Sequence, residues 1–137
     1  MQTGYKNLTA FFDEVLAELP CQSDTKAYIV SVFAKYKNPE YDLSKDSVTL
    51  TFSQARDKQD FSTFQNLGDW IFFSKTFVPA HLHNASEDYY DTVGRLSYYS
   101  CYRLINKQWK LFEEMADNFI VLEKETRTLL GKNLSLL

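Results

Sequence analysis

Residues that break helices are scarce in this chain, and their scarcity constrains the fold more than any other feature. Four Gly and three Pro are spread over 137 residues. All-β folds need turn residues more often, because a turn follows each short strand. Apolar residues instead recur at three- and four-residue intervals, which is the pattern of amphipathic helices. The sequence therefore predicts an all-α fold, a compact bundle of six or seven helices in a single domain over residues 1–137.

Caps and breakers set the limits of the expected helices. Pro20 ends the first helix because it cannot continue the hydrogen-bond ladder, and Ser23 is a good N-cap for the second. Ser86 caps a later helix, Gly131 fits the C-cap of the last one, and residues 131–137 are expected to fray. The expected helices cover about residues 7–19, 24–37, 46–56, 60–77, 86–105 and 107–130, the last with a break at Asp117-Asn118. The pair 60–77 and 86–105 is expected at the centre of the bundle.

The segment 46–56 allows two interpretations. Val48, Leu50 and Phe52 alternate with polar residues, which is typical of a strand. A lone strand would leave its backbone groups unpaired, and no second strand is evident in the sequence. We therefore predict a helix here, capped by Ser44 or Ser47.

The charge and the cysteine content limit the possible functions of the chain and the cellular compartment in which it is expected. The net charge is −3 and the sequence pI is about 5.3, so nucleic acid is not an expected partner. Cys21 and Cys101 lie far apart and are expected to be two free thiols in a reducing compartment. The sequence shows no apolar leader and no apolar run of about 18 residues. We therefore expect a cytoplasmic protein that does not cross a membrane.

Carboxylates are expected on solvated helix faces. Glu113-Glu114 is an adjacent pair of this kind, and Glu123 with Arg127 is expected to give ordinary i,i+4 support to an exposed face. The chain has no G-x-S-x-G, no C-x-x-C and no glycine-rich phosphate loop. We therefore predict no catalytic residue and no cofactor.

A row of small residues in the segment 86–105 is a candidate binding site. Gly94, Ser97 and Cys101 are spaced by three and four residues, so they share one helix face. Such a row permits close approach of a neighbouring helix, and this is the favoured interpretation. The alternative is a ligand pocket, since pockets are mostly apolar with few polar groups. Its candidate lining residues are Tyr90, Gly94, Ser97, Tyr98, Cys101 and Tyr102.

A histidine pair near the middle of the chain is a weak metal candidate. His81 and His83 precede two acidic residues, Glu87 and Asp91, and these residue types can bind zinc or iron. Residues two apart do not share a helix face, so the pair would need a loop. The favoured interpretation is two exposed histidines followed by acidic residues that complement a helix dipole. No metal is therefore predicted.

Aromatic residues make up 16% of the chain, which is high. The favoured interpretation is a thick aromatic core. The alternative is a partner or dimer surface, because exposed Tyr and Trp are enriched in interface hot spots. The residues beyond what one apolar stripe can bury are Trp70, Tyr89, Tyr99, Tyr102 and Trp109.

The middle of the chain carries a pattern that resembles a known group of proteins. The matching residues are Leu67-Gly68-Asp69, Phe73, Phe77, Pro79, Tyr89-Tyr90, Gly94, Ser97-Tyr98, Leu111-Phe112-Glu113-Glu114-Met115-Ala116 and Phe119. This pattern is similar to that of a family of uncharacterised small bacterial helical proteins, over about half of the chain. The resemblance implies an all-helical fold and points to no particular activity. The chain departs from the pattern at Trp70 and at His81 and His83.

The sequence shows no catalytic constellation, no basic patch and no cofactor motif. The functional prediction therefore rests on the surplus of aromatic residues. We expect a non-catalytic helical binding or regulatory module that acts through protein contacts, as a homodimer or with another protein partner. The alternative is a small metal- or ligand-dependent enzyme that uses His81, His83 and nearby carboxylates. The two hypotheses differ in whether the imidazoles and a carboxylate converge on one cleft.

Overall fold

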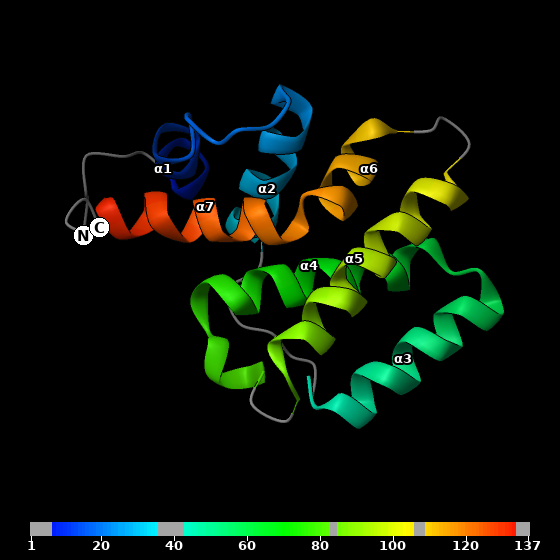
Figure 1. Cartoon of the computed structure of the whole chain (residues 1–137). Helices are drawn as coiled ribbons and strands as arrows, with labels where there is room; N and C mark the ends of the chain where they lie inside the picture. Colours follow the sequence, from blue (N-terminus) through cyan, green and yellow to red (C-terminus); the bar gives the residue numbers. More distant parts are fainter. Residues whose placement is uncertain (1–6, 36–42, 83–84, 106–108, 134–137) are drawn as a thin grey trace.

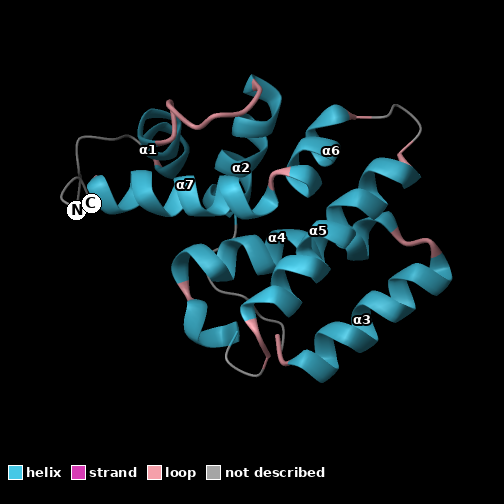
Figure 2. Cartoon of the chain, viewed as in Figure 1, coloured by secondary structure: helices cyan, strands magenta, loops and turns pink. Residues whose placement is uncertain are grey.

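The computed structural model describes residues 7–35, 43–82, 85–105 and 109–133, and within them it contains helices and loops and no strand (Figure 2). The all-α prediction is confirmed. The described helices are α1 (Leu8–Val15), α2 (Ser23–Lys35), α3 (Lys45–Lys58), α4 (Phe61–Phe77), the 3₁₀ turn η1 (Pro79–Leu82), α5 (Glu87–Leu104), α6 (Lys110–Asp117) and α7 (Phe119–Lys132). None of the helices in this part of the chain combines the length and apolar character that a membrane span requires.

Helices α4 and α5 pack along each other and form the centre of the fold, as the sequence predicts (Figure 1). Helix α3 packs on α4 at one side, and α6 packs on α5. Helix α7 contacts both central helices, while α1 packs on α2, and α2 in turn contacts α6 and α4. The two central helices therefore present surfaces to most of the other elements, and the candidate sites lie along them.

The ambiguous segment is helical. Helix α3 covers it, and the Ser44 side chain accepts a hydrogen bond from the backbone N–H of Ser47 at 3.4 Å. Val48 and Ala55, two helical turns apart, are buried, whereas Leu50 is 59% exposed. The buried residues of this segment therefore recur with the period of a helix. They do not follow the alternation of apolar and polar residues that is typical of a strand.

Several helix ends differ from the sequence prediction. Helix α1 ends at Val15 rather than near residue 19, although Leu16 and Leu19 in the turn that follows remain buried. Ser23 is the first residue of α2 rather than its cap, and Gly131 lies within α7 rather than after it. The break at residues 117–118 is confirmed, because one helix ends at Asp117 and the next begins at Phe119. Residues 134–137 of the predicted tail lie outside the described residues.

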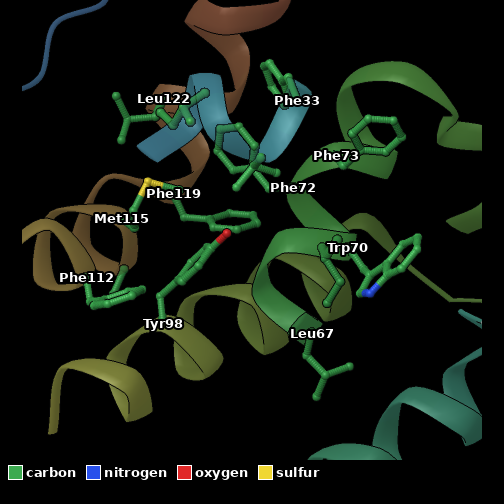
Figure 3. Close-up of a cluster of buried hydrophobic side chains, with 14 of the residues drawn as sticks. Phe33, Leu67, Trp70, Phe72, Phe73, Tyr98, Phe112, Met115, Phe119 and Leu122 are labelled. Atoms are coloured by element: carbon green, nitrogen blue, oxygen red, sulfur yellow. The ribbon is translucent and has the colours of Figure 1, made fainter. Parts of the chain in front are cut away.

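The core is built largely from aromatic rings. Phe119 from α7 meets Phe72 from α4 edge-to-face, with ring centroids 5.5 Å apart, and lies 6.0 Å from Tyr98 of α5 (Figure 3). Trp70 is 7% exposed and belongs to this core. Edge-to-face pairs add to the stability that area burial gives. Tyr99 and Trp109 are 46% and 48% exposed, so the core does not absorb the whole aromatic surplus.

Replacing Gly94 by alanine should destabilise the fold by about 1 to 3 kcal/mol. A Cβ at this position would lie 2.5 Å from Cζ of Phe119, so the ring or the helix must shift. Gly131 is the matched control, since a Cβ there meets nothing within 4 Å. Gly131→Ala, within α7, should raise stability by about 0.5 to 1 kcal/mol. Chemical denaturation measures both, and equal effects of the two substitutions would contradict the packing argument.

Candidate functional site

The predicted row of small residues faces a filled part of the core. Gly94, Ser97 and Cys101 are buried, and the space over Gly94 is occupied by the ring of Phe119. Between α4 and α5, a Cβ on Gly68 would lie 2.8 Å from the ring of Tyr98. The row therefore lets α5 approach its neighbours closely. Tyr102, the outermost pocket candidate, is partly buried against the core.

Cys101 is a buried free thiol, as Cys21 is a half-buried one. Its Sγ lies 3.8 Å from the carbonyl oxygen of Phe61, within weak hydrogen-bond range. Burial, followed by the nearby charge of Asp69, raises the pKa of the Cys101 thiol well above its usual range. A thiol that stays protonated is a poor nucleophile, so Cys101 serves as a small core residue.

A buried carboxylate forms the polar centre of the core. Asp69 on α4 is 4% exposed, and its Oδ1 accepts hydrogen bonds from the hydroxyls of Tyr28 and Tyr98, both at 2.6 Å. Gln65 in turn donates to the Tyr28 hydroxyl at 3.1 Å. The network joins α2, α4 and α5 and satisfies groups that would otherwise be costly to bury.

Burial has the largest effect on the pKa values of the groups in this network. It raises the pKa of Asp69 to about 6, although the hydrogen bonds from Tyr28 and Tyr98 act in the opposite direction. Burial and the neighbouring Asp69 charge raise the pKa of both phenols well above their usual value. The two tyrosines are therefore permanent donors, and Asp69 is the group that titrates near neutral pH.

A second buried cluster joins the end of α4 to the start of α5. The Lys75 side chain is 7% exposed, and its ammonium group forms an ion pair with Asp91, whose side chain is 8% exposed. The same ammonium lies 3.4 Å from Oε1 of Glu87. Tyr90, fully buried beside this cluster, donates its hydroxyl hydrogen to the backbone carbonyl of Leu43. The cluster thus fixes the first turns of α5 against α4.

Helix α7 adds a fourth buried charged residue, and here the sequence prediction is wrong. Glu123 is 0% exposed rather than on a solvated face. Arg127 binds it with two parallel hydrogen bonds of 2.9 and 2.8 Å, and the Thr76 hydroxyl donates to it at 3.2 Å. The bidentate bonds satisfy the buried carboxylate, and they hold the Arg127 guanidinium at the edge of the Lys75 cluster.

A cavity of about 140 Å³ opens between these charged groups. It lies where α4, η1, α5 and α7 meet. Its lining among the described residues consists of Lys75, Pro79, Leu82, Glu87, Tyr90 and Arg127. Tyr90 is thus a pocket candidate from the sequence that does line a cavity, one helical turn before Gly94.

Of the metal candidates from the sequence, Glu87 lines this cavity. His81 lies on η1 and is exposed, while His83 lies outside the described residues. Glu87 and Asp91 are both paired with the Lys75 ammonium, which opposes a metal ion at the same carboxylates. Among the residues that the structure describes, no three His, Cys, Asp or Glu side chains gather in a way that could hold a metal.

A groove lies on the opposite, outer side of α5. It has a volume of about 320 Å³ and is bounded by α5 and the end of α6. Arg95 forms part of it and donates its Nε–H to the carbonyl of Ala116 at 3.2 Å, which fixes α6 to α5. The lining among the described residues is Thr92, Arg95, Leu96, Tyr99, Ala116 and Asp117. Leu96 and Tyr99 are about half exposed here, so this groove presents apolar surface to solvent.

The sequence contained a usable signal for the buried charges that our prediction missed. Helix α4 has an apolar arc so wide that nearly every side is buried, and a charged residue within it must be buried too. Asp69 and Lys75 both lie in that helix. Glu123 follows Leu122 and precedes Thr126 by three residues, which places it at the edge of the buried stripe of α7.

Comparisons with known proteins return no match: no protein-family model, no curated protein and no solved structure is significantly similar to this chain.

Proposed function

We propose that the chain is a non-catalytic helical binding module that associates with a second copy of itself through the outer face of α5. The observation that carries the proposal is the composition of this face. Leu96 and Tyr99 expose 45% and 46% of their surface and line a groove, although both belong to the longest described helix of the chain. Half-exposed tyrosine and leucine on a rigid helix suit an interface.

The charges along the same face favour a second copy as the partner. Five exposed residues follow one another at helical spacing, namely Asp88, Thr92, Leu96, Tyr99 and Arg103. An antiparallel copy related by a two-fold axis between residues 95 and 96 would set Tyr99 opposite Thr92 and Arg103 opposite Asp88, with the two Leu96 side chains next to the axis. Acidic and basic ends then pair across the two-fold axis, as an isologous interface requires. Arg103 also lies over the Tyr99 ring, 6.0 Å from its centroid, which extends the face.

The groove provides depth for such a contact. Its second wall is formed by Ala116 and Asp117 at the end of α6, so a facing helix can lie between two elements rather than on a flat surface. Asp117 offers a further partner for an arginine of the facing copy. Arg95 is fixed to the α6 backbone, so the two walls of the groove are held together.

Replacing Leu96 by glutamate should weaken self-association at least about tenfold, because each copy would bring a carboxylate into the apolar middle of the interface. Leu50→Glu is the matched control, since Leu50 is an exposed leucine on α3 and lies outside the groove. Sedimentation equilibrium measures the dissociation constants of both variants and of the unsubstituted chain. Equal weakening by the two substitutions would contradict the proposed interface.

A further inference from the structure

The cavity between α4, η1, α5 and α7 presents a specific set of charges to its interior. Lys75 and Arg127 line it as two cations, and Glu87 lines it as a carboxylate. The carboxylates that hold the two cations lie behind the wall, since the side chains of Asp91 and Glu123 are 8% and 1% exposed. A molecule entering the cavity therefore meets two positive groups and one negative group among the residues that the structure describes.

The two cations keep hydrogen-bond donors for a ligand. The Lys75 ammonium has three N–H bonds, and Asp91 and Glu87 accept two of them. Arg127 uses its Nε and Nη2 on Glu123. Within the described residues, the third ammonium hydrogen and the Nη1 group donate to no protein acceptor. A ligand carboxylate can accept from both, and such charge-assisted bonds are among the strongest in proteins.

Glu87 provides the complementary group. Its Oε1 is the atom that faces Lys75, so Oε2 is left for a donor from the ligand. The Glu87 side chain is 67% exposed, at the mouth of the cavity rather than within the core. A ligand ammonium placed there would meet a carboxylate while its own carboxylate reaches the two cations.

The size and walls of the cavity limit the ligand further. The volume of about 140 Å³ is close to that of engineered cavities that hold one benzene molecule, so there is room for about six non-hydrogen atoms. Pro79, Leu82 and Tyr90 are the uncharged residues of the lining that the structure describes. Such a wall suits a short apolar side chain and leaves no space for a large one.

We propose that this cavity binds a small α-amino acid, with its carboxylate between Lys75 and Arg127, its ammonium group at Glu87 and its short side chain against Leu82. The site lies apart from the outer groove of α5, and it does not depend on self-association. Lys75 on α4 pairs with Asp91 on α5. A ligand bound to Lys75 would therefore lie next to both central helices.

The first test is a titration of the ¹⁵N-labelled chain with four probes. L-Alanine carries both charges, propionate and ethylamine each lack one of them, and inorganic phosphate is an unrelated anion. L-Alanine should give saturable amide shifts around the cavity and bind about tenfold more tightly than propionate, since it adds a charge-assisted bond to Glu87. The absence of saturable shifts with millimolar L-alanine, or tighter binding of phosphate, would overturn the proposal.

Variants at the mouth of the cavity make the test specific and leave the buried ion pairs intact. Glu87→Gln should lower the affinity for L-alanine about tenfold without lowering that for propionate, because the change removes the carboxylate that the ammonium group needs and that an anion does not. Glu125→Gln is its control, because Glu125 is an exposed glutamate of α7 that lines neither the cavity nor the groove of α5. Leu82→Trp should fill the cavity and abolish binding of both probes. Undiminished L-alanine binding by Glu87→Gln and Leu82→Trp would refute the site, and thermal melts confirm that each variant is folded.

Discussion

Lys75→Met should lower the free energy of unfolding by about 3 to 5 kcal/mol, because the substitution leaves Asp91 buried without its partner. The two side chains are 7% and 8% exposed, so water does not replace the lost ammonium. Chemical denaturation at neutral pH measures the loss. Lys124→Met is the control: Lys124 is exposed on α7, and its substitution should change stability by less than about 0.5 kcal/mol.

The double variant Lys75→Met/Asp91→Leu separates the cost of an orphaned charge from the value of the pair. Replacing both members of a buried ion pair by apolar residues is often neutral or stabilising. The double variant should therefore recover most of the stability that the single variant loses. If the double variant is less stable than Lys75→Met, the lysine and the aspartate contribute independently and the coupling argument fails.

Asp69 should give the protein a component of stability that is lost as the pH rises. Its folded-state pKa of about 6 lies above the ordinary value of 3.8, so between these values the folded state binds the proton more tightly than the unfolded chain. The contribution is fully present below about pH 3.8 and disappears above pH 6. It amounts to about 3 kcal/mol in total, of which about 2 kcal/mol is lost between pH 4 and pH 7.

Asp69→Asn isolates this component from the other carboxylates of the chain. Both tyrosine hydroxyls donate to the same oxygen, Oδ1, and the amide of asparagine keeps an acceptor at that place. The stability of the unsubstituted chain relative to Asp69→Asn should therefore fall as the pH is raised from 4 to 7. A difference that stays constant or rises over this range would contradict the raised pKa of the buried carboxylate.

The fold could be predicted because one kind of signal dominates the sequence. Apolar residues at helical spacing marked α4 and α5 as central, and Ser86 is the N-cap that it was predicted to be. Even the segment around Val48 was resolved by the argument that a lone strand leaves its backbone unpaired. The helix ends were predicted less accurately than the helices themselves. Capping and packing both influence where a helix ends, and they can shift its end by one or two residues.

The candidate sites could be predicted only in part, for a physical reason. The width of the buried helix faces indicates that Lys75, Asp69 and Glu123 are buried, although charged side chains are normally solvated. Which groups then satisfy Lys75 and Asp69 depends on contacts between distant segments. The ion pair of Lys75 with Asp91 joins two helices across a turn, and the Glu123–Arg127 pair borders the same cavity from the far end of the chain. The spacing of residues within one helix does not show which residues of another helix they contact. Tyr99 and Trp109, by contrast, were correctly placed among the aromatic residues that exceed the core.

The central claim is that a second copy of the chain lies antiparallel along the outer face of α5. Isotope-filtered NOE spectroscopy on a mixture of ¹³C-labelled and unlabelled chains tests it most directly, since only contacts between copies give signals. We expect NOEs from the Leu96 methyl groups of one copy to Leu96 and Tyr99 of the other. An absence of intermolecular NOEs at millimolar protein, or NOEs confined to another surface such as that around Leu50, would contradict the claim.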